Sequence, residues 1–155
     1  MKKIAALFAI MLLIFTGCKK ENKEEIDTEY PEILTTANSF PLQCGVLTRG
    51  QTATIKATFS DNKELGAYSI DLHHNFDQHN HSTEVSNCTF DAKKTPVKPF
   101  VFIQDYTIPA GSKRYEATAQ ISIPADVDPG DYHFMIRLTD KEGWQTIKGL
   151  SIKIQ

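Results

Sequence analysis

The chain has 155 residues, and 41% of them are apolar, which is enough for one hydrophobic core and too much for a disordered protein. Its 17 basic and 19 acidic residues give a formal net charge of −2. Nucleic-acid-binding proteins concentrate lysine and arginine, so this balance gives no reason to expect DNA or RNA as a partner.

The N-terminus has the form of an export signal. Two lysines precede an apolar run, residues 4–15, which is too short to span a membrane comfortably. Thr16-Gly17-Cys18 follows, and a small residue before cysteine resembles the signal of a bacterial lipoprotein. The resemblance implies that residues 1–17 are removed as a signal peptide and that Cys18 carries lipid, which anchors the chain to a membrane. A plain secretory signal cut nearby is the alternative, and it also exports the chain.

Residues 18–29 are predicted to be the lipidated cysteine and a flexible tether. They are rich in charge and nearly free of apolar side chains, so they cannot collapse into a core. The opening Lys19-Lys20-Glu21 resembles signals that send some Bacteroidota lipoproteins to the outer face of the outer membrane. We therefore expect a cell-envelope protein that is lipid-anchored to the outer membrane and faces either the periplasm or the cell surface.

If Cys18 carries lipid, two cysteines remain, Cys44 and Cys88. Because an exported chain enters an oxidising compartment, we predict a disulfide between them. Such a bridge closes a loop of about 44 residues and contributes roughly 3–4 kcal/mol on the loop-entropy account. A metal-binding role is disfavoured because neither thiol lies in a Cys-x-x-Cys pair.

Alternating apolar and polar residues predict about seven β-strands and no helix outside the signal. The predicted strands are residues 30–34, 52–59, 67–74, 100–108, 115–123 and 131–139, with a last strand ending at residue 154. Residues 35–51 are predicted to be mostly loop. Residues 75–98 form a long loop of the kind that either carries function or is disordered. Ile147 is out of phase with the residues after it, which predicts a bulge near Gly149.

This pattern predicts an all-β fold for residues 30–155, an immunoglobulin-like β-sandwich, with a jelly roll or small barrel as the rival topology. Gly130-Asp131-Tyr132 resembles the opening of the sixth strand in immunoglobulin-like domains. In those domains a tyrosine at this corner bonds back to the backbone, and we expect Tyr132 to do so.

The chemistry of the chain is concentrated in residues 71–84, DLHHNFDQHNHSTE, which hold four of its five histidines. The four are His73, His74, His79 and His81, with Asp71 and Asp77 between them. Imidazole is the commonest metal ligand in proteins and titrates near neutral pH. The cluster therefore indicates either a metal site or a proton-sensitive site, although solvated histidines remain an alternative.

The fifth histidine, His133, is predicted to join this cluster. In an immunoglobulin-like order the third and sixth predicted strands are antiparallel neighbours, and alternation directs both His73 and His133 outward. His79 and His81 are two residues apart and share one side of an extended segment. We predict ligands from His73, His79, His81 and His133, with Asp71 or Asp77 as a further oxygen ligand or an outer partner. His74 is a further candidate ligand, but its position in the alternation places it on the core face of its strand.

Four imidazoles, or three with a carboxylate, suit Zn, and Cu or Ni nearly as well. Three ligands with one open position would permit catalysis, whereas four would make a structural or carrier site. The sequence leaves this choice open.

The segment His73-His74-Asn75-Phe76-Asp77, followed by His79-x-His81-Ser82, resembles a motif of a family of Bacteroidota lipoproteins, domain of unknown function 4625. The similarity runs from about Tyr30 to the C-terminus and includes Asp61-Asn62 and Gly130-Asp131-Tyr132. It implies a lipid-anchored, immunoglobulin-like domain without an established activity, and it supplies no substrate.

The leading functional hypothesis is a non-enzymatic envelope lipoprotein that binds Zn or Cu through the histidines. No Gly-x-Ser-x-Gly elbow, Walker loop, dinucleotide fingerprint or His-Glu-x-x-His motif is present in the sequence. An adhesion or accessory module that binds an envelope protein or glycan through sandwich loops, with incidental histidines, is the alternative. A metal hydrolase is a third hypothesis.

Overall fold

The computed structural model describes residues 26–84 and 86–155. The predicted signal peptide, Cys18 and most of the predicted tether therefore lie outside the described residues. Within the described part the chain forms strands, turns and loops but no helix. It follows that no helix in this part is long and apolar enough to cross a lipid bilayer.

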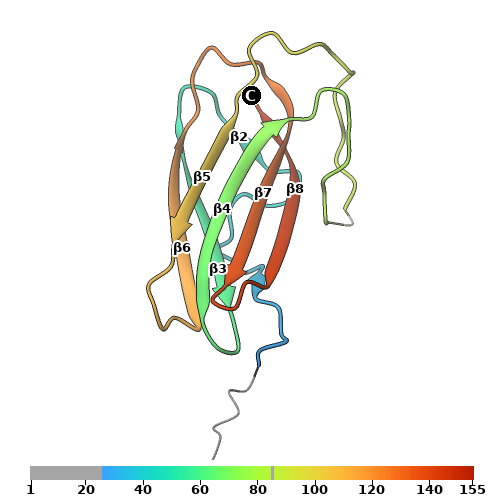
Figure 1. Cartoon of the computed structure of the whole chain (residues 1–155). Helices are drawn as coiled ribbons and strands as arrows, with labels where there is room; N and C mark the ends of the chain where they lie inside the picture. Colours follow the sequence, from blue (N-terminus) through green and yellow to red (C-terminus); the bar gives the residue numbers. More distant parts are fainter. Residues whose placement is uncertain (1–25, 85) are drawn as a thin grey trace, which may run out of the picture.

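The strands form two packed sheets, a β-sandwich (Figure 1). Their bounds are β1 Glu32–Leu34, β2 Val46–Leu47, β3 Thr52–Ser60, β4 Leu65–His74, β5 Phe102–Thr107, β6 Arg114–Ser122, β7 Gly130–Asp140 and β8 Gln145–Ile154. One sheet has the order β1-β3-β6 and the other the order β2-β8-β7-β4-β5. The all-β sandwich is confirmed, and this strand order is compatible with an immunoglobulin-like topology.

The core lies between the sheets and is built by the alternation seen in the sequence. Phe59 and Ile121 face inward from the smaller sheet, and Leu72, Phe134 and Leu138 face them from the larger one. Each is fully buried, and burying a side chain of this size stabilises the fold by about 1.5–3 kcal/mol. Alternate residues of the same strands point outward, which is how Asp71 and His73 reach the outer face.

Two details differ from the sequence prediction. Val46–Leu47 is a strand inside the segment predicted to be loop, because a parallel two-residue pairing with β8 is too short to show periodicity. The expected bulge near Gly149 is wrong, since β7 and β8 pair in one continuous register from Gly130 to Thr139. Ile147 is simply exposed on the outer face, and the register shift of β4 against β7 falls between Leu65 and Ala67.

The predicted tyrosine corner is present. The Tyr132 hydroxyl donates to the carbonyl of Asp128 at 2.7 Å and accepts from the amide of Phe100 at 3.1 Å. Tyr132 is fully buried, and these bonds satisfy its polar end. They also fix the start of β7 one residue before His133.

The long loop of residues 75–98 is fastened to the sandwich rather than free. A disulfide joins Cys44 to Cys88, as predicted, with a Cα–Cα distance of 5.3 Å. Nearer the end of the loop, the amides of Val97 and Lys98 donate to one carboxylate oxygen of Asp128 at 2.7 and 2.8 Å. The loop hangs down beside the larger sheet in Figure 1.

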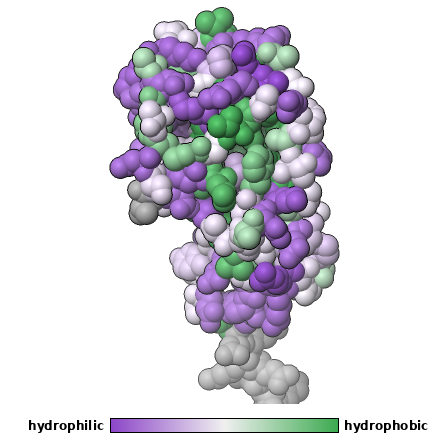
Figure 2. All heavy atoms as spheres, turned by 180° about the vertical axis from the view of Figure 1, so that it is seen from behind, coloured by the Kyte–Doolittle hydropathy of each residue, from purple (hydrophilic) through white to green (hydrophobic). Residues whose placement is uncertain are grey.

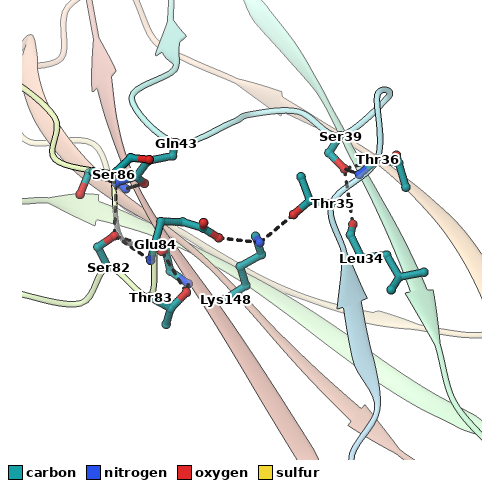
Figure 3. A network of polar contacts seen from close by, with 12 residues as sticks. Leu34, Thr35, Thr36, Ser39, Gln43, Ser82, Thr83, Glu84, Ser86 and Lys148 are labelled. Atoms are coloured by element: carbon teal, nitrogen blue, oxygen red, sulfur yellow. Dashed lines mark hydrogen bonds and ion pairs between the residues drawn. The ribbon is translucent and has the colours of Figure 1, made fainter.

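A further anchor of the loop lies on β8. Lys148 lies between two partners, forming an ion pair with Glu84 at 2.6 Å and donating to the hydroxyl of Thr35 at 2.9 Å (Figure 3). Lys148 and Glu84 border an apolar cavity of about 190 Å³ between the sheets, lined mainly by aliphatic and aromatic side chains. Figure 2 shows apolar side chains gathered on this side of the molecule.

Candidate metal centre

The pairing of β4 with β7 builds the floor of the histidine cluster. The two strands are antiparallel neighbours, and His73 lies directly opposite His133. This confirms the adjacency predicted from the alternation and the expected strand order. Directly opposed residues have Cβ atoms about 4.5–5.5 Å apart, and the two imidazole rings lie side by side on the outer face with centroids 5.6 Å apart.

The loop of residues 75–98 places two more imidazoles, those of His79 and His81, over these two rings. Gly149 of β8 allows the loop to pass close to the sheet. The amide of Thr83 donates to the Gly149 carbonyl at 2.9 Å, and the Gly149 amide donates to the Thr83 hydroxyl at 3.0 Å. A Cβ atom at residue 149 would lie only 2.0 Å from the carbonyl oxygen of His81. The backbone of the loop therefore lies directly on the glycine, and His79 and His81 come over the sheet.

Three of the histidines present their ring nitrogens to one another. One nitrogen from each of His73, His79 and His81 lies within 4.8 Å of the other two. The Nε2 atoms of His73 and His79 are 3.5 Å apart. Two nitrogens bound tetrahedrally to one zinc ion at 2.0–2.1 Å are about 3.3 Å apart, so this spacing is close to that of two ligands of one ion.

Two aspartates orient these rings. His73 Nδ1 lies 2.7 Å from Asp71 Oδ1, and His79 Nδ1 lies 2.5 Å from Asp77 Oδ1. The bond with His79 lowers the pKa of Asp77, so this carboxylate is ionised and can only accept. Nδ1 of His79 is therefore the donor in this pair, and a neutral ring held in this way presents its Nε2 lone pair to a metal ion. Metal-binding histidines are commonly held in this tautomer by a carboxylate.

His133 lies beneath the other three rings. Its ring centroid is 5.6, 4.9 and 5.3 Å from those of His73, His79 and His81. Although it is on the outer face, only 1% of it is exposed, because the loop covers it. Its Nε2 donates to the carbonyl of His79 at 3.0 Å, and its buried Nδ1 has no hydrogen-bond partner among the residues that the structure describes. It thus holds the backbone of His79, outside the three-nitrogen group.

Burial lowers the pKa of His133 to about 4. The bond to the His79 carbonyl opposes this shift, and the neighbouring imidazoles add to it. Because the unfolded-state value is 6.5, the unfolded chain binds more protons between pH 6.5 and about 4. The metal-free protein is therefore expected to lose about 3 kcal/mol of stability as the pH falls through this window. Urea unfolding with a chelator present measures this loss.

The matched variants for this measurement are His133→Gln and His74→Gln. Glutamine keeps an amide donor for the His79 carbonyl but does not titrate, so His133→Gln should flatten the acid slope. His74→Gln should leave the slope in place. An unchanged slope in His133→Gln would show that another group causes the acid loss.

His74 does not join the cluster. It lies opposite Tyr132 in the sheet register, and its ring packs on Phe76 with centroids 4.9 Å apart. Its position in the alternation sends it to the face opposite His73, as the sequence indicated. The structure thus brings together His73, His79, His81, His133, Asp71 and Asp77 from the predicted set and leaves out His74.

Sequence reasoning missed the role of Gly149. A glycine within a strand often marks a close backbone approach, and that signal was available. A polar cavity of about 280 Å³ was also not foreseen. It adjoins the cluster and is lined in part by Gln43, Gln78, His79, Asn87 and His133. It gives water or a small polar molecule access to the histidines.

The fold and the cluster define a β-sandwich domain with a covered, histidine-rich outer face. The family model described as Domain of unknown function (DUF4625) matches residues 16–155, and the chain belongs to this family. No curated protein matches the chain.

Proposed function

We propose that this protein is a non-enzymatic cell-envelope lipoprotein that binds one divalent transition metal ion, Zn²⁺ or Cu²⁺. The ligands are His73, His79 and His81, and the aspartates Asp71 and Asp77 orient the first two. His133 supports the backbone of His79. The fourth position is open to water or to a small ligand from the adjoining polar cavity, which suits metal acquisition or buffering.

One observation carries this proposal. The Nε2 atoms of His73 and His79 face each other at 3.5 Å while both Nδ1 atoms bond to aspartates. Two lone pairs at this distance repel unless a proton or a metal ion lies between them, and a nitrogen of His81 lies within 4.8 Å of both. A donor set of imidazoles favours Zn²⁺ or Cu²⁺ over oxygen-seeking ions such as Mg²⁺. The thiols of Cys44 and Cys88 are not available, because they form a disulfide.

The envelope location rests on the N-terminal sequence. Thr16-Gly17-Cys18 resembles a lipoprotein signal, and the residues after it resemble a surface-export signal of Bacteroidota. The disulfide supports an oxidising compartment. The end of β4, which carries His73, lies at the end of the sandwich away from the N-terminal segment (Figure 1).

A second candidate function is adhesion or accessory binding of an envelope protein or glycan. It is favoured by apolar side chains that are exposed on and beside the edge strand β5. Val97 is 89% exposed, Val101 57% and Ile103 68%. Exposed apolar groups gathered in one place are typical of interaction surfaces.

Calorimetric titration of the metal-free protein with Zn²⁺ and Cu²⁺ tests the proposal. One ion per chain is expected to bind. His73→Ala should weaken binding by about a hundredfold or more, because it removes a ligand rather than an outer partner. The control is His74→Ala, which changes the adjacent histidine outside the cluster and should bind as the unchanged protein does. Equal binding by both variants, or no stoichiometric binding at all, would favour the second candidate function.

A further inference from the structure

A second group of potential ligands lies at the opposite end of the sandwich. Asp27, Asp140 and Glu142 each place a carboxylate oxygen within 4.8 Å of the other two. Asp140 ends β7 and His133 lies near its start, so the two groups are about 23 Å apart along the strand. This acidic group shares no residue with the histidine cluster.

The buried carboxylates of this group have oxygens without partners. Asp27 is 3% exposed and Asp140 is 4% exposed. Asp27 Oδ1 accepts from the side chain of Asn62 at 2.8 Å, and Asp140 Oδ1 accepts from the amides of Gly143 and Trp144 at 2.6 and 2.8 Å. The Oδ2 atom of each is buried and has no hydrogen-bond partner among the described residues. Buried ionised oxygens are stable only when they are paired or coordinate a metal.

The surroundings of Asp27 favour its charged form. The bond from Asn62 is the main cause that lowers the pKa of Asp27, and Lys63 also favours its ionised form. Asp140 accepts two backbone hydrogen bonds through one oxygen, which leaves its second oxygen for another partner. Glu142 is exposed and adds a third negative charge at the surface.

We infer that Asp27, Asp140 and Glu142 form a Ca²⁺ site. The donors are all oxygens, which select hard cations over the ions that imidazole prefers. Ca²⁺ accepts irregular sets of carboxylates and waters, whereas Mg²⁺ demands near-ideal octahedral geometry and keeps most of its waters. Three carboxylates drawn from two separate segments suit the less demanding ion.

The ion would fasten the segment before β1 to the turn between β7 and β8. This contact already exists, because the indole of Trp144 donates to the carbonyl of Asp27 at 2.9 Å and packs against Tyr30 with ring centroids 5.0 Å apart. Ca²⁺ bound to Asp27 and Asp140 adds a direct link between the same two segments. The site therefore orders the chain where it enters the sandwich.

Trp144 is the single tryptophan of the chain and adjoins the site, so it serves as a built-in probe. Terbium, which replaces Ca²⁺ in oxygen sites, should emit when Trp144 is excited, and Ca²⁺ should displace it. Ca²⁺ should also raise the melting temperature by about 10 °C at a concentration a hundredfold above Kd. Mg²⁺ at the same concentration should raise it much less.

Glu142→Gln is the principal variant, because Glu142 is exposed and its replacement leaves the fold intact. It should weaken Ca²⁺ binding at least tenfold. Asp140→Asn keeps an acceptor for the turn amides and should weaken binding further. Glu116→Gln, which changes an exposed glutamate on β6, should leave Ca²⁺ binding unchanged. Absent terbium emission, equal effects of Mg²⁺ and Ca²⁺, or unaltered binding in Glu142→Gln would each overturn the assignment.

Discussion

Replacing both Cys44 and Cys88 with alanine is expected to lower the free energy of unfolding by about 4 kcal/mol. The bridge spans 44 residues of sequence, and a cross-link over a loop of that length removes much of the conformational freedom of the unfolded chain. The same change should weaken Zn²⁺ binding about tenfold or more, since the bridge fixes the loop that carries His79 and His81. Urea unfolding and zinc titration measure the two effects.

The reduced form of the unchanged protein is the control for this variant. It should match the double alanine variant in stability and in zinc affinity, because both lack the cross-link. A loss below about 1 kcal/mol would show that the remaining anchors, such as the Lys148–Glu84 ion pair, hold the loop without the disulfide.

Gly149→Ala is expected to displace the loop from β8 and to weaken Zn²⁺ binding at least about a hundredfold. The added methyl group would lie 2.0 Å from the carbonyl oxygen of His81, a distance that no rearrangement of a side chain can relieve. Forcing two backbones apart in a packed region costs about 3 kcal/mol of stability, and the hydrogen bonds to Thr83 are lost with it. Zinc titration and hydrogen exchange at residues 79–84 report the displacement.

Ile147→Ala provides the matched control for Gly149→Ala. Ile147 lies two residues away on the same face of β8 and is 44% exposed. Its truncation should leave zinc affinity unchanged and stability within about 1 kcal/mol. If Gly149→Ala bound zinc as tightly as this control, the seating of the loop on β8 would not position the ligands.

The strand pattern was predictable because the core is built by simple alternation. Thr52–Ser60 and Arg114–Ser122 each place apolar residues on one face, and a slip of one residue would expose that whole face. The same parity placed His73 beside His133 once the two strands were taken as neighbours. Val46–Leu47 escaped prediction because two residues carry no period.

The burial of His133 was not predictable from its own strand. Alternation directs it outward, and only the path of residues 75–98 covers it. That path depends on contacts between segments far apart in the chain, such as the disulfide and the approach of His81 to Gly149. The carboxylate group of Asp27, Asp140 and Glu142 was not predicted for the same reason, since nothing local in the sequence links Asp27 to Asp140.

The central claim is that His73, His79 and His81 bind one metal ion. Crystals of the zinc-loaded protein, measured at the zinc absorption edge, test it most directly. The predicted result is a single anomalous peak among these imidazoles, about 2.0–2.1 Å from the Nε2 atoms of His73 and His79, with a nitrogen of His81 as the third ligand. Zinc found only elsewhere on the protein, with these three rings free of it, would contradict the account.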